Sequence, residues 1–248
     1  MLRLTPHKSK FLKLAISLLL TGNLFGCAMN HTTDGLGNQF IAFNDVKVIT
    51  QKEAKSLERD DRSVRIKSDM ESIGFRRVKV STIIDSLSDT VLSIYKNQYE
   101  LLQRYSTIVD NHRDVMSFIN ANKDKNKTEL RKEAERFDQL AVKQEEKIGP
   151  KLAAYQTANK EIQRENLKLA GELLKQTATL VTVFRNSTDE MKGAEALAIL
   201  LNAGKINDAY KLAEIRIHLA TVANDFIDDE KAVIEITKQI QEILDEKL

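Results

Sequence analysis

The sequence is poor in residues that interrupt helices or cross-link chains. Cys27 is its only cysteine, tryptophan is absent, and proline occurs only at positions 6 and 150. A single cysteine excludes an intramolecular disulfide, a cysteine-based zinc site and a pair of redox thiols. After residue 74 the only glycines are Gly149, Gly171, Gly193 and Gly204. So few helix breakers over that distance indicate long helices.

A surplus of one charge is missing too. The chain has 38 Lys and Arg against 36 Asp and Glu. Four of the basic residues, Arg3, Lys8, Lys10 and Lys13, lie in the first 26 positions, so 34 remain in the rest of the chain. A nucleic-acid-binding domain concentrates a basic surplus on one face. We therefore expect no nucleic-acid partner.

The N-terminal residues have the layout of a signal peptide. Residues 1–13 hold four basic side chains and no acid, and residues 14–25 read LAISLLLTGNLF. A basic preface followed by a short apolar run is typical of a cleaved leader. A retained spanning helix is the weaker interpretation, because it needs about 20 apolar residues, and this run is shorter and contains Asn23.

The leader ends in Leu24-Phe25-Gly26-Cys27, which resembles the lipobox of bacterial lipoproteins. That resemblance implies cleavage before Cys27, a diacylglycerol on its sulfur and an acyl chain on its new amine. With Ala28 rather than an aspartate after the cysteine, it also implies passage to the outer membrane. Phe25 departs from the small residue usual in that family. An ordinary secretory leader is the alternative, although lipidation also accounts for an unpaired cysteine in an oxidising compartment.

Behind the anchor we expect a tether at 27–45 and a small, irregular membrane-proximal region at 46–79. Thr50 and Glu53 have the spacing of a helix capping box, which predicts a short helix near 51–61. Alternating residues predict short strands at 46–48, 64–67 and 75–80. The candidate contacts with an anionic surface are Arg62, Arg65, Arg76 and Arg77. The alternative is a solvated face, since acids are interleaved with these cations.

Residues 80–248 show the heptad spacing of packed helices. Positions at steps of four and three follow each other from Val80 to Ile119 and again from Leu212 to Ile243, nearly all of them apolar. The first series contains Gln98 and His112 and the second contains Asp229. The first series alone corresponds to about 60 Å of helix.

A third apolar series, from Leu130 to Phe184, is interrupted at Gly149-Pro150, where we expect a kink or a break. Polar turns are predicted at 122–127 and 186–190, and Gly204 is expected to close a short apolar helix over about 190–203. The predicted fold is all-α: an elongated antiparallel bundle of three long helices plus one short apolar helix.

Candidate chemistry is sparse. His112 is more typical of a hydrogen-bonded seam residue than of a metal ligand or base, and His218 is expected to be exposed. Residues 122–133 loosely match a calcium loop, but Lys127 stands where glycine is needed. The acidic run 228–230 is expected to be solvated. We therefore predict no enzyme activity, no metal and no cofactor beyond the acyl chains on Cys27.

The segment 194–201 reads AEALAILL and is the candidate apolar tip, with Leu197, Ile199 and Leu200. Its layout resembles helical pore-forming toxins of the cytolysin A kind, which implies a membrane-active alternative. Eight residues are too short to span about 30 Å of hydrocarbon. The preferred expectation is an outer-membrane-anchored lipoprotein whose helices form a non-enzymatic scaffold, with a protein partner or self-association through the seams and no small-molecule substrate.

Overall fold

The computed structural model describes residues 46–80, 82–189 and 203–246. Helices dominate these ranges and no strand occurs within them. The all-α class is therefore confirmed. The helices are listed here by their bounds: α2 Gln51–Ser56, α3 Arg59–Ile73, α4 Thr82–Asn111, α5 Arg113–Asn122, α6 Lys127–Asp138, α7 Ile148–Asp189, α9 Ala203–Asp229 and α10 Lys231–Asp245, with a short 3-10 turn η2 at Gln144–Glu146.

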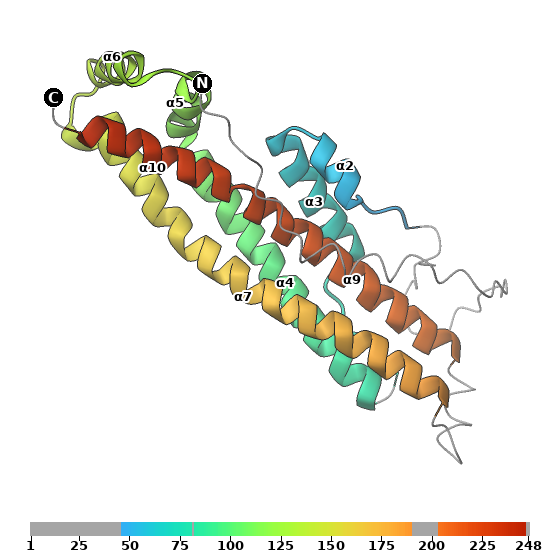
Figure 1. The fold of residues 1–248 in the computed structure, drawn as a ribbon. Helices are drawn as coiled ribbons and strands as arrows, with labels where there is room; N and C mark the ends of the chain where they lie inside the picture. Colours follow the sequence, from blue (N-terminus) through green and yellow to red (C-terminus); the bar gives the residue numbers. More distant parts are fainter. Residues whose placement is uncertain (1–45, 81, 190–202, 247–248) are drawn as a thin grey trace. The chain divides into compact units, whose positions relative to one another are not determined.

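Helices α4, α7 and α9 pack against one another along their lengths (Figure 1). Gln98 of α4 bonds to Asn166 of α7, whereas Arg104, further along α4, pairs with Glu161, which lies earlier on α7. The two helices therefore run antiparallel. Helix α7 also runs antiparallel to α9, because Asn166 contacts Asn224 while Gln163 contacts Ile227.

Helices α2 and α3 cover the α4 and α9 side of this packing. The capping box at Thr50 and Glu53 forms as predicted and starts α2. The strand expected at 64–67 is wrong, because these residues lie in α3. Arg62, Ile66 and Met70 recur at helical spacing and are buried together, and this burial outweighs the local alternation. The ranges expected as strands at 46–48 and 75–80 are without regular structure.

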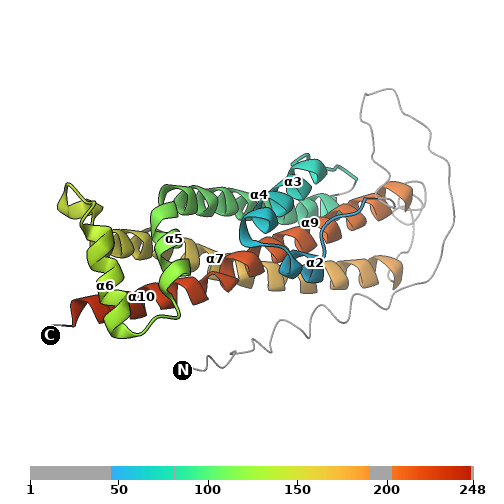
Figure 2. The same cartoon turned by 90° about the horizontal axis from the view of Figure 1, so that it is seen from above.

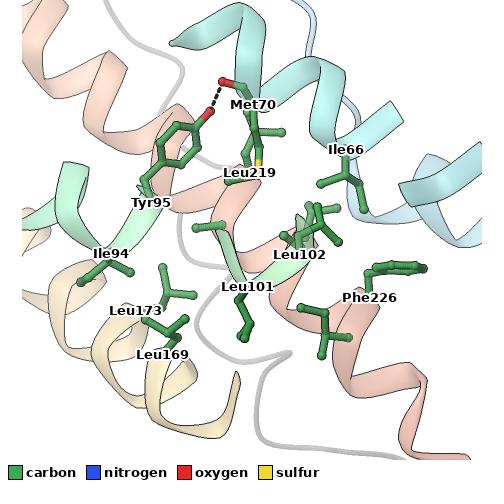
Figure 3. Close-up of a cluster of buried hydrophobic side chains, with 14 of the residues drawn as sticks. Ile66, Met70, Ile94, Tyr95, Leu101, Leu102, Leu169, Leu173, Leu219 and Phe226 are labelled. Carbon is green, nitrogen blue, oxygen red and sulfur yellow. Dashed lines mark hydrogen bonds between the residues drawn. The ribbon is translucent and has the colours of Figure 1, made fainter. Parts of the chain in front are cut away.

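The buried apolar residues form two separate cores. The first core joins α3, α4, α7 and α9, and Figure 3 shows part of it around Leu101, Leu102 and Phe226. Tyr95 belongs to this core and donates a hydrogen bond to the carbonyl of Met70. The second core joins α5, α6, α10 and the start of α7, which lie together in Figure 2. Among the described residues, Ile108 alone packs against both cores.

The long apolar series predicted from the sequence are interrupted at positions that hold neither proline nor glycine. The series from Val80 breaks at His112 between α4 and α5, and the series from Leu212 breaks at Glu230 between α9 and α10. Pro150 instead lies in the first turn of α7, where its missing N–H costs nothing, and the chain is already non-helical before it. Gly204 likewise begins α9 rather than closing a helix. The short apolar helix expected at 190–203 falls, but for Ala203, outside the described residues.

Candidate interaction surface on helix α7

Helix α7 has a buried face and an exposed face, both at heptad spacing. The buried face includes Leu152, Tyr155, Ile162 and Leu169, which enter the two cores. This burial is what orders the helix, because an isolated amphipathic segment gains most of its stability from packing. The opposite face forms the outward line, which comprises Ala153, Thr157, Lys160, Arg164, Leu167, Gly171, Leu174 and Ala178. All eight are exposed.

The outward line divides into a basic part and an apolar part. Lys160 and Arg164 form the basic part, and Leu167 and Leu174 dominate the apolar part. The exposed fractions of these leucines are 68% and 47%, which is unusual for residues of this size one heptad apart. Gly171 lies between them, and a Cβ added there meets no atom within 4 Å. The surface is thus narrow, open and apolar, with cations at one end.

Two of the acids of α7 pair with a cation of α4. Arg104 of α4 pairs with Glu165 at 2.6 Å and with Glu161 at 3.6 Å. Glu172 lies 3.9 Å from Lys168 on the same helix. The outward line itself contains no acid. Within the described ranges neither Lys160 nor Arg164 forms an ion pair, so the basic part presents positive charge beside the apolar part.

A second feature is a buried polar layer between the two cores. It consists of Arg62 from α3, Tyr105 from α4, Tyr155 from α7, and Glu230 at the break after α9. Arg62 pairs with Asp229 at 2.8 Å and lies 5.0 Å from the centre of the Phe226 ring. The hydroxyls of Tyr105 and Tyr155 and one carboxylate oxygen of Glu230 are buried without a hydrogen-bond partner in the described part of the chain.

Burial controls the charge of this layer. It raises the pKa of Glu230, against the opposing effects of the nearby Tyr105 hydroxyl and of Arg59, whose Nη1 lies 4.0 Å from Oε2. It also raises the pKa of Tyr155 to about 12, so this phenol stays neutral. His112 stacks edge-on against Tyr155 with ring centroids 5.7 Å apart. Both helix breaks therefore lie beside the same turn of α7.

The other predicted residues are placed as follows. Arg62 is buried in the polar layer, exposed Arg65 pairs with buried Asp69, and Arg77 pairs with Asp89 at the surface. Arg76 is exposed, and its carbonyl accepts a hydrogen bond from buried Arg216. The four candidate cations thus do not share one face. Cys27, His31, Leu197, Ile199 and Leu200 lie outside the described residues.

Three expectations about polar side chains need correction. His218 is partly buried, with Nε2 2.9 Å from the carbonyl oxygen of Ile49, because α2 and its preceding segment cover it. Within the run 228–230, Glu230 is buried because the helix break turns it inward. His112 is at the α4–α5 break and caps α5 without a side-chain hydrogen bond.

The calcium-loop residues make other contacts. Asn126 caps α6 through a box with Glu129, and Glu133 pairs with Lys125 at 3.3 Å. That hydrogen bond from Lys125 lowers the pKa of Glu133. Over the ranges 46–80, 82–189 and 203–246, no three metal-ligating side chains come together.

Comparison with known proteins supplies no relative. No family model, curated protein or solved structure matches this chain. In the part of the chain that the structure describes, no helix has both the length and the apolarity to cross a membrane.

Proposed function

We propose that the protein is a lipoprotein of the bacterial outer membrane, anchored through Cys27, whose helices form a non-enzymatic scaffold for another protein. The basic leader, the apolar run and Leu24-Phe25-Gly26-Cys27 support the anchor. Two or more acyl chains hold a protein stably on a bilayer. In the finer arrangement that we propose, residues 27–45 tether three long antiparallel helices, and residues 190–203 form a short apolar helix.

The observation that carries the scaffold role is the outward line of α7. A helix that buries one heptad face and exposes a second has a surface ready for another helix. The described helices fill their interior with side chains in two cores. Catalytic sites are usually concave and lined by convergent polar groups, whereas the exposed feature of α7 is a long helical face.

The anchor is tested by growing cells with an alkyne-tagged fatty acid and following the label on the full chain. The wild type is expected to carry the label and to partition into the outer membrane. Cys27→Ser is expected to lose both the label and the membrane fraction. A wild-type chain that stays unlabelled would show that the leader is an ordinary secretory one.

A further inference from the structure

The outward line of α7 has the chemistry of a binding surface for a particular kind of helix. Over residues 153–178 it extends about 38 Å at 1.5 Å per residue. Its apolar part, from Leu167 to Ala178, covers less than half of that length. A partner must therefore satisfy both the apolar part and the two cations next to it.

The apolar part contains two small residues: Gly171 lies between the two leucines, and Ala178 lies after Leu174. Small residues at a helix interface let two backbones approach closely, so that large side chains on either side interlock. A flat bilayer would gain little from this shape, because it would meet only two large apolar side chains. The shape favours a helix.

The charges select against a second copy of this chain. In a parallel pair in register, Lys160 and Arg164 would each face their own kind. In an antiparallel pair centred on the apolar part, they would lie opposite positions within residues 179–186, a range whose sequence contains no acid. Like charges across a helical interface disfavour pairing. We therefore expect the acids to come from a different sequence.

We propose that the outward line of α7 docks an amphipathic helix of another protein, with apolar residues over Leu167 and Leu174 and acidic residues over Lys160 and Arg164. This deepens the proposed scaffold role and depends on it. The partner helix lies along the solvent face of α7, at the opposite side from the two cores. The acids of the partner helix pair with Lys160 and Arg164. On the neighbouring side of α7, Arg104 of α4 pairs with Glu161 and Glu165 in the same way.

The test is site-specific photo-crosslinking in the full, lipidated chain, made in the cells that produce it. A photoreactive phenylalanine replaces Leu174, and in a matched chain it replaces Val64, which is 68% exposed on α3. We expect the probe at 174, and not at 64, to give an adduct with one other protein. The crosslinked peptide should be helical in pattern, apolar at heptad positions and acidic on its flank.

Three second-site variants separate docking from folding. Lys160→Glu combined with Arg164→Glu is expected to reduce the adduct about 10-fold, through loss of two ion pairs and gain of repulsion. Lys96→Glu, an exposed position on α4, is the charge control and should leave it unchanged. Gly171→Gln should abolish the adduct without lowering the melting temperature, because its Cβ has open space in this chain and glycine is a poor helix former.

Each other result would overturn the proposal. An adduct with a second copy would show self-association, one with phospholipid would show a membrane contact, and one within the chain would show that another segment covers α7. Absence of any adduct at 174, or an adduct indifferent to Gly171→Gln and to the charge reversal, would equally refute it. Fatty-acid labelling of the same chains shows independently whether the anchor is present.

Discussion

The two cores hold their helices together by different means. In the first core, buried amides cross between helices: Gln98 donates to Asn166 at 3.1 Å, and Asn166 and Asn224 bond reciprocally. In the second core, the polar links between helices lie at or near the surface, such as Lys127 with Glu246 and Arg131 with the carbonyl of Ile243. Buried amides fix register more strongly than surface pairs, so the first core is the better specified of the two.

The largest effect should come from emptying both cores. Leu102 in the first core and Leu152 in the second are fully buried. Replacing either with alanine should lower the free energy of unfolding by about 3 kcal/mol through lost burial and a residual cavity. Because Ile108 alone bridges the cores, the double variant should be additive within about 0.5 kcal/mol. Urea denaturation followed by circular dichroism measures all three variants, and strong non-additivity would mean that the cores form one unit.

A smaller loss is expected from the amide network. Asn166→Ala leaves the buried amide of Gln98 without its acceptor and removes the two side-chain bonds of Asn166 to Asn224, although Asn224 still donates to the main-chain carbonyl of residue 166. The expected cost is about 2 kcal/mol in the free energy of unfolding. Asn97→Ala, an exposed neighbour of Gln98, is the matched control and should cost little beyond noise. If Asn166→Ala were as mild as the control, the claim that buried amides distinguish the first core would be wrong.

The acidic side of α9 should make stability depend on pH. Burial raises the pKa of Asp225 to about 6, with Lys55 opposing it, while Gln51 donates a hydrogen bond to its carboxylate. The folded state therefore holds this proton over a range where the unfolded chain has released it. The free energy of unfolding should fall by about 2 kcal/mol as pH rises from about 4 to 6, and level off above.

Asp225→Asn removes this titration while keeping an oxygen for Gln51. Its denaturation midpoint should vary less between pH 4 and 6 than that of the wild type, leaving the part that comes from Glu230, whose pKa is also raised by burial. A variant that keeps the full wild-type slope would show that Asp225 is not the group responsible. Asp114→Asn is the control, and its denaturation midpoint should change between pH 4 and 6 as much as that of the wild type. Hydrogen bonds from Lys151 and Val115 lower the pKa of Asp114, despite the opposing effect of its partial burial, so Asp114 does not titrate in this range.

The smallest effect concerns the surface pairs of the second core. Lys151 of α7 pairs with Asp114 of α5, and both side chains are partly exposed. Lys151→Gln should cost about 0.5 kcal/mol at low salt and nothing measurable at about 1 M salt, because such pairs are screened. A loss that persisted at high salt would mean that the second core also depends on buried polar contacts.

The heptad series predicted the interior well but not where helices end. Leu101, Tyr105, Leu219 and Phe226 are all buried as their spacing indicates. The break at Glu230 has no proline or glycine to signal it, and arises where the buried polar layer meets α9. Local alternation at 64–67 was misleading because four residues are too few to distinguish a strand from a helix that packs one face.

The outward line of α7 could have been found from the sequence. Its spacing is as regular as that of the buried face, but most of its residues are not large and apolar, so a hydrophobic pattern alone does not reveal it. Knowing which heptad face is covered requires the positions of α4 and α9, which no single segment encodes. The unsatisfied groups of the polar layer are equally non-local, since Arg62, Tyr105, Tyr155 and Glu230 come from distant parts of the chain.

Helix α7 continues through 42 residues, whereas the helices beside it are broken at His112 and at Glu230. Both breaks lie beside Tyr155. At that level, α7 passes both breaks without an interruption of its own. Tension applied along the molecule would therefore pass largely through the backbone of α7 at this point, and a helix bound along the outward line would add support next to both breaks.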